Sequence, residues 1–95
     1  MPPEIDPVIH QPVRTRILAL LLNAGMCDYS AIKTQLALSD GHMSTHMKVL
    51  LEEGYVSMEK AFVALKPRTT YRLTKLGKKR FADYVAALQR IIQGL

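Results

Sequence analysis

The sequence contains one cysteine, no tryptophan and no long apolar run. Because a disulfide needs two thiols, Cys27 cannot form one within the chain, and a reducing cytoplasm is the simplest compartment for it. A membrane-spanning helix needs about 18 or more consecutive apolar residues, and no such run is present. The segment MPPEIDPVIH carries acids and prolines where a signal peptide needs positive charge and an apolar run. We therefore expect a cytoplasmic protein with no membrane partner.

Acidic residues are absent between Lys60 and Ala82. The basic residues of this interval are Lys60, Lys66, Arg68, Arg72, Lys75, Lys78, Lys79 and Arg80. Since the whole chain has 13 Lys and Arg against 8 Asp and Glu, its net charge of +5 is concentrated here. Such a local excess is typical of a surface that binds a polyanion. The alternative is a solvated basic face without a partner.

The chain is long enough for one domain with a modest core, and we expect a single domain over residues 1–95. A helix over 40–53 is its clearest element. Ser39 is a good N-cap and Gly54 suits the left-handed residue that follows a helix. The helical period turns Met43, Met47 and Leu50 towards the core.

The opposite face of this helix is small, polar and weakly basic, with Gly41, Thr45 and Lys48 outermost and His42 and Ser44 beside them. A DNA major groove accepts a helix of this width. A helical glycine costs roughly 1 kcal/mol relative to alanine, and close approach to another surface would give Gly41 a purpose. Ordinary solvated positions are the alternative. We expect Asp40 to face the free N–H groups of its own helix.

Two more helices precede this one. Pro12 can open a helix over 12–24, and Asp28 can cap a shorter one over 29–36. Only three residues separate the second helix from the third, so residues 28–53 form a helix-turn-helix. We expect the turn to leave the third helix open to solvent.

From Val56 the period changes to alternation, which predicts a hairpin over 56–73 with a turn over 64–68 and with Lys66 and Arg68 near its tip. Thr74 can cap a final helix over about 75–93, which is roughly 30 Å long if it has about 20 residues. Its apolar stripe is longer than is needed to cover the core of so small a domain. We therefore predict that part of it meets a second copy, while folding back on its own core is the alternative.

The run Ser44–Leu50 followed by Glu53–Val56, and the run PRTTYRLTKLG at 67–77, resemble motifs of MarR- and ArsR-type repressors. The resemblance implies an α+β winged helix-turn-helix with a core over 8–73 and a long C-terminal dimerisation helix over 74–95. It implies a homodimeric transcriptional regulator, most simply a repressor, that binds double-stranded DNA. The helix 40–53 would enter the major groove, and the wing, residues 61–70, would reach the backbone or minor groove.

The resemblance assigns groove contacts to Gly41, His42, Ser44, Thr45 and Lys48, and wing contacts to Lys66, Arg68 and Thr70. The predicted dimer contacts are Ile5, Val8, Ile9, Phe81, Tyr84, Val85, Leu88, Ile91 and Ile92. His46 matches the histidine of the family motif, but its angle borders the core, which favours a packed histidine. One departure concerns the wing, where Ala64 and Leu65 stand in place of a glycine and an arginine.

Three other functions are weighed against this one. The sequence shows no serine, histidine and acid in catalytic spacing and no phosphate-binding loop, so we do not predict an enzyme. A metal-responsive sensor would need ligand spacing that Cys27 and the three histidines lack, and we predict no metal or cofactor. A winged helix used for protein contact stays open, although the acid-free interval argues against it.

Overall fold

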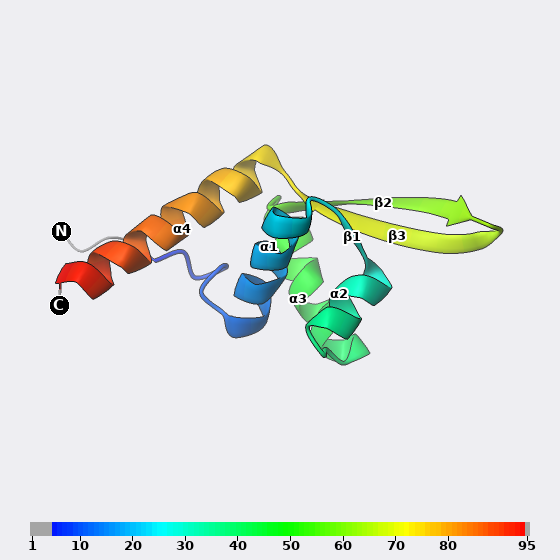
Figure 1. Ribbon diagram of the computed structural model, residues 1–95, viewed down its shortest axis with the longest axis horizontal. Coiled ribbons are helices and arrows are strands. Elements are labelled where there is room, and N and C mark those ends of the chain that lie inside the picture. The colour runs from blue at the N-terminus through cyan, green and yellow to red at the C-terminus, as the bar shows by residue number, and fades with distance from the viewer. Residues whose placement is uncertain (1–4, 95) are drawn as a thin grey trace.

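The computed structural model describes residues 5–94, so the first four residues and the last one of the predicted domain lie outside the description (Figure 1). The elements are α1 (Pro12–Ala24), β1 (Cys27–Asp28), α2 (Tyr29–Gln35), α3 (Asp40–Glu52), β2 (Val56–Val63), β3 (Lys66–Leu73) and α4 (Lys75–Gly94). This order confirms the predicted fold class, mainly α with a β-hairpin. Within the described residues, no helix is long and apolar enough to span a membrane.

The three strands form one antiparallel sheet in the order β1-β3-β2. Val56 pairs with Leu73 at the base of the hairpin and Val63 pairs with Lys66 at its end. The two-residue strand β1 adds to β3 through Cys27 and Tyr71, a pairing that the sequence did not predict. Figure 1 shows the hairpin leaving the helical body on one side and α4 leaving it on the other.

The core lies where α1, α2 and α3 meet the base of the sheet. Ile17, Leu21, Ile32 and the predicted inward residues of α3 are buried, together with Cys27. On α1, Leu18 is buried as well, whereas Leu20 is only partly buried and Ala24 is exposed. The fold therefore leaves the helical body compact and the hairpin largely outside it.

The predicted helix caps are confirmed, although α2 and α3 each end one residue earlier than predicted. The Ser39 hydroxyl accepts a bond from the N–H of His42, and the Asp28 carboxylate accepts one from the N–H of Ala31 at 2.7 Å. Gly54 has φ +80°, the left-handed conformation that glycine adopts without a Cβ clash. These local bonds fix where α2 and α3 begin and where the chain turns into β2.

The hairpin turn is tighter than predicted. It consists of Ala64 and Leu65 alone, both with positive φ, and Lys66, Pro67 and Arg68 belong to β3. Two central residues with positive φ match a type I′ turn, whose twist suits a two-residue hairpin. The sequence hid this turn because type I′ turns favour Asn-Gly and similar pairs.

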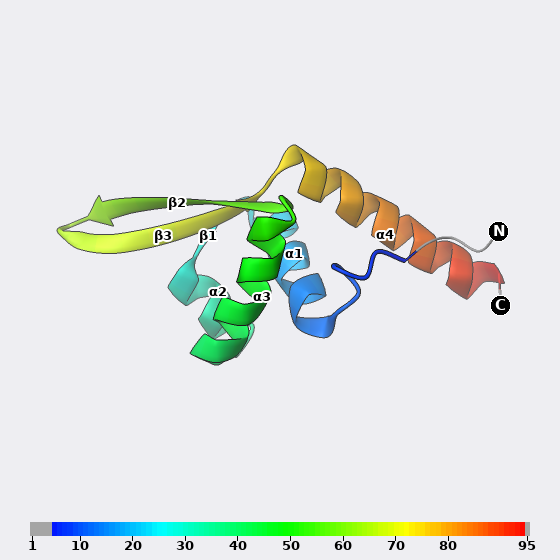
Figure 2. The same ribbon diagram turned by 180° about the vertical axis from the view of Figure 1, so that it is seen from behind.

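α4 is joined to the body at its first turn and by the segment before α1. The Thr74 hydroxyl donates to the carbonyl oxygen of Gly54 and accepts from the N–H of Gly77. Residues 5–11 run beside α4 (Figure 2), where Nδ1 of His10 lies 2.9 Å from the Tyr84 hydroxyl. These contacts hold α4 along the N-terminal segment.

Candidate nucleic-acid interface

The helix α3 separates its buried and exposed faces as the sequence predicted. Met43, Met47 and Leu50 are buried against the core. The predicted groove residues are all exposed, namely Gly41, His42, Ser44, Thr45 and Lys48. The core side chains therefore fix the rotation of the helix, and the polar face points away from the protein body.

Gly41 has no intramolecular reason to be glycine. Its φ is not in the left-handed region, and a Cβ built on it meets nothing within 4 Å. Because glycine weakens a helix, an alanine here would be the more stable choice if only the chain itself mattered. The open space above Gly41 is thus available to a surface outside the chain.

The exposed face of α3 borders the hairpin. Ser44 and Lys48 line an open cleft of about 450 Å³ together with Tyr71 of β3 and Tyr29 of α2. Nζ of Lys48 is 3.9 Å from the Glu52 carboxylate. An ion pair of this kind on the surface contributes little to the free energy of folding. Lys48 therefore remains available to an external anion on the side of α3 that meets the hairpin.

Asp40 does not face the free N–H groups of its own helix, so that prediction is wrong. Its carboxylate accepts a bond from the Tyr29 hydroxyl at 3.0 Å and pairs with Nζ of Lys33 at 2.8 Å. The bonds from Lys33 and Tyr29 lower the pKa of Asp40. Both partners belong to α2, so this cluster links α2 to α3. It also offsets the negative charge of Asp40, which would otherwise repel a phosphate.

His46 is packed, as its helical angle predicted. Its Nδ1 lies 3.1 Å from Nη1 of Arg14, whose guanidinium also donates to the carbonyl oxygen of Val8. Burial, the Arg14 charge and His42 lower the pKa of His46, so the neutral ring can accept from the guanidinium. The sequence could not show this link, because α1, α3 and the N-terminal segment meet there only in the fold.

The three predicted wing residues differ in their surroundings. Lys66 is exposed, and it forms no ion pair with any residue of 5–94. Nε of Arg68 lies 3.8 Å from the Asp28 carboxylate. Thr70 is half-buried in the middle of the sheet, opposite Asp28 on one side and Glu59 on the other. Of these three residues, only Lys66 thus presents a positive charge without an acidic partner, and Thr70 is poorly placed for an external contact.

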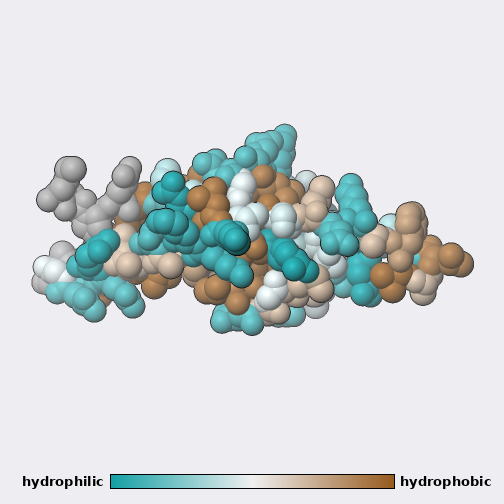
Figure 3. Space-filling view, turned by 90° about the horizontal axis from the view of Figure 1, so that it is seen from above, coloured by the Kyte–Doolittle hydropathy of each residue, from teal (hydrophilic) through white to brown (hydrophobic). Residues whose placement is uncertain are grey.

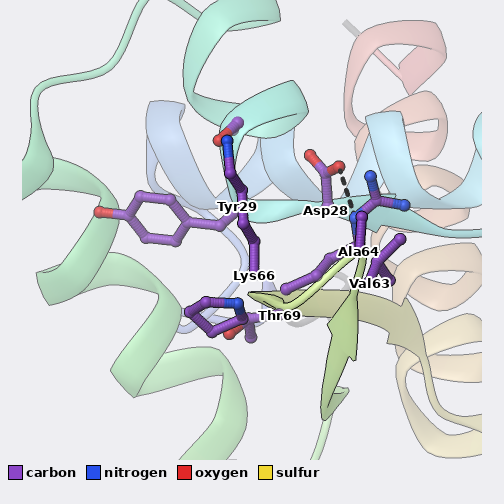
Figure 4. A pocket seen from close by; sticks show the side chains of 9 residues that line it. Asp28, Tyr29, Val63, Ala64, Lys66 and Thr69 are labelled. Atoms are coloured by element: carbon purple, nitrogen blue, oxygen red, sulfur yellow. Dashed lines mark ion pairs between the residues drawn. The ribbon is translucent and has the colours of Figure 1, made fainter.

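A hollow of about 690 Å³ lies between the start of α2 and the outer part of the hairpin. Figure 4 shows it with Asp28 and Tyr29 on the α2 side and with Val63, Lys66 and Thr69 on the hairpin side. The dashed line marks the ion pair between Asp28 and Arg68. This pair ties the hairpin to the N-terminus of α2 on the side of β1.

The predicted dimer residues fall into two groups. Ile9, Phe81 and Tyr84 are buried within their own chain, so their prediction as contacts to a second copy is wrong. The apolar side chains that stay partly or fully exposed are Ile5, Val8, Val85, Leu88, Ile91 and Ile92. The first part of the α4 stripe therefore folds back on the body, and the later part continues as an uncovered face that ends at Ile92, 70% exposed.

Within residues 5–94, no three His, Cys, Asp or Glu side chains lie close enough together to hold a metal ion. The open surface is instead a helix with a polar outer face, beside a long hairpin that carries cations. This is the arrangement of a winged helix. A family model described as a winged helix DNA-binding domain matches residues 13–92, and the chain belongs to that family.

The chain is similar to solved structures that are named as transcriptional regulators. The transcriptional regulator homologue from Pyrococcus horikoshii OT3 is 30% identical with a TM-score of 0.85, covering 92% of this chain and 86% of that one. The transcriptional repressor BigR from Xylella fastidiosa is 25% identical with a TM-score of 0.66, covering 83% and 75%. The uncharacterized protein MJ0432 from Methanocaldococcus jannaschii is 28% identical over 88 residues, 93% of this chain and 96% of that protein. Family and fold are those of DNA-binding transcriptional regulators, not of enzymes.

Proposed function

We propose that the protein is a homodimeric repressor that binds specific sequences in double-stranded DNA. The observation that supports this most is the open face of α3, where every predicted groove residue is exposed and the space above Gly41 is empty. BigR is called a transcriptional repressor, which supports the same role for this chain.

Affinity and specificity come from different side chains in this proposal. Lys48 and Lys66 contact phosphates, and each phosphate neutralised contributes about 0.9 to the slope of log affinity against log salt concentration. Thr45 touches a base edge or a thymine methyl, and His42 donates to a guanine acceptor. Arg68 joins the phosphate contacts only by leaving Asp28.

The exposed end of the α4 stripe supports the homodimer. Val85 and Ile92 are exposed and Leu88 is half-buried, and this spacing puts all three on one side of the helix. Two copies joined there by a two-fold axis present two α3 helices, which would meet half-sites about 34 Å apart. Val85→Glu combined with Ile92→Glu should give monomers by analytical ultracentrifugation, whereas Leu22→Glu on the exposed side of α1 should not.

The decisive experiment selects bound duplexes from random DNA and then titrates them by fluorescence anisotropy. Thr45→Ala combined with Lys48→Ala should weaken binding by about tenfold or more, since one good base contact is worth about 1–3 kcal/mol. The melting temperature should stay nearly unchanged, because both side chains are exposed. As a control matched in charge, Asn23→Ala with Arg90→Ala, two exposed positions outside the acid-free interval, should bind as the wild type does. Equal affinity of all three proteins would rule out α3 as the DNA-reading helix.

A further inference from the structure

The end of the hairpin is apolar and faces solvent. Phe62 is 78% exposed and Leu65 is 96% exposed, with Val63 and Ala64 between them. Figure 3 shows hydrophobic side chains gathered at the end of the molecule that the hairpin forms. Contiguous apolar patches on a soluble protein mark contact sites more often than single exposed side chains do.

The backbone conformation of the hairpin turn does not favour Ala64 and Leu65, the two residues found there. Ala64 and Leu65 have φ of 51° and 65°, where residues with a Cβ are strained and a bulky one is an outlier. Asn-Gly would form the same turn without that strain. Leu65 thus stands where turn geometry alone would select glycine, and it places a large apolar side chain at the extreme end of the hairpin.

Cations lie directly behind the apolar end. The strand register sets Lys66 opposite Val63 and Arg68 opposite Ala61, while Lys60 lies opposite Thr69 on the other face. An apolar end flanked by positive charge complements a partner with anionic edges and an apolar interior. A DNA duplex has this composition, with phosphates outside and stacked bases inside.

The hairpin is long enough to reach a second groove. Val56 is buried at its base and Val63 lies seven residues further along β2, which at about 3.3 Å per residue is about 23 Å. Half a helical repeat, about 17 Å, separates a major groove from the next minor groove. With α3 in the major groove, the end of the hairpin can therefore enter the neighbouring minor groove.

We propose that Leu65, supported by Phe62, is an apolar wedge that enters between two base pairs from the minor groove and kinks the DNA. The inference rests on the proposed function and adds a bending activity to it. Apolar side chains inserted in this way unstack a base step and bend the duplex towards the major groove. Flexible TA and CA steps yield most readily, so the bound sequences should carry one at a fixed distance from the bases that α3 contacts.

The test measures bending and binding separately on the full-length protein. A duplex selected from random DNA carries a donor and an acceptor dye at its ends for energy transfer, and 2-aminopurine at the TA or CA step found at that fixed distance reports unstacking. Wild-type protein should raise both energy transfer and 2-aminopurine fluorescence. Ala64→Asn with Leu65→Gly suits the turn, so the variant should fold, yet it should lose both signals and bind about tenfold more weakly, the loss expected for one unburied leucine. Phe62→Thr should reduce both signals, and Leu22→Thr on α1 should behave as wild type.

The outcomes separate the two proposals. Wild-type protein that selects no duplex would overturn the proposed function and the wedge with it. Specific binding to a duplex that stays straight, or bending that the hairpin variants share, would overturn the wedge alone. A smaller assembly in ultracentrifugation for the Phe62 and Leu65 variants, with bending unchanged, would show that the apolar end contacts protein and would also overturn it.

Discussion

The first turns of α3 and α4 are built alike but stand in opposite surroundings. Each follows a hydroxyl N-cap, Ser39 or Thr74, and each has a glycine within the next three residues. A Cβ on Gly77 would lie 2.0 Å from the carbonyl oxygen of Tyr55, whereas a Cβ on Gly41 would meet nothing within 4 Å. One glycine is required by the chain's own packing, and the other is not.

This difference separates structural from functional residues at other places in the molecule. Arg68 and His46 are engaged by the chain itself, through Asp28 and Arg14, while Lys66 and His42 are exposed near them. A polar residue bonded within the chain contributes mainly to the shape of the surface. An exposed residue beside it is free to contact a partner. Each pair can be tested by changing both members in the same way.

The largest effect is expected for Gly77→Ala. The added methyl would collide with backbone at Tyr55, which cannot move aside as a flexible side chain can. Overpacking of this kind typically costs about 1–3 kcal/mol and occasionally more, so the free energy of unfolding in urea should fall by about 3 kcal/mol. Gly94→Ala, at an open position of α4, is the control and should not destabilise. Equal stability of the two variants would mean that α4 does not pack on Tyr55 in solution.

Gly41→Ala should have the opposite effect on stability. The methyl enters open space and removes a helical glycine, so unfolding should cost up to about 1 kcal/mol more. If α3 lies in the groove, the same methyl reduces its approach to DNA, and affinity should fall by about tenfold, a loss within the usual cost of overpacking. Gly94→Ala again serves as control, with affinity unchanged. A stabilised protein with full affinity would show that DNA does not come close at residue 41.

The contrast also shows what the sequence could predict. The N-caps, the inward residues of α3 and the order of the helices follow from local patterns, namely a hydroxyl or carboxyl before a helix and an apolar period of 3.6. Ser39, Asp28 and Met47 are therefore placed correctly from the sequence alone. The resemblance over 67–77 includes the glycine at position 77. The reason why glycine is needed there, the close approach of Tyr55, is visible only in the structure.

Features that depend on pairing between distant segments could not be predicted. β1 has two residues, too few to show an alternating pattern, and it exists because Cys27 pairs with Tyr71. The buried part of the α4 stripe, including Phe81 and Tyr84, looks in sequence like the exposed part that follows it. The hairpin turn carries no glycine or asparagine, so its length and its exposed apolar end appear only in the fold.

Lys66 and Arg68 test the comparison within the hairpin. If Lys66 contacts a phosphate, Lys66→Ala should lower the slope of log affinity against log salt concentration by about 0.9 for each protomer, and so by about 1.8 for the homodimer. Arg68→Ala should lower it less, because Asp28 already offsets part of that charge. Neither variant should change the preferred sequence, which selection from random DNA would verify. An equal or larger change for Arg68 would show that the ion pair with Asp28 opens when DNA binds.

The smallest effect concerns His46 and pH. The pKa of His46 is lowered in the folded protein, chiefly by burial and then by Arg14 and His42. Below its ordinary value of about 6.5, the unfolded chain takes up a proton that the folded chain resists, so stability should decrease as pH falls from about 7 towards 5. His46→Asn retains an acceptor for Arg14 but cannot titrate, so urea unfolding across this range should show a weaker dependence on pH. His42→Asn should keep most of the dependence, because burial and Arg14 remain. A loss of slope in His42→Asn but not in His46→Asn would reverse the assignment of the packed and the open histidine, and with it the rotation of α3.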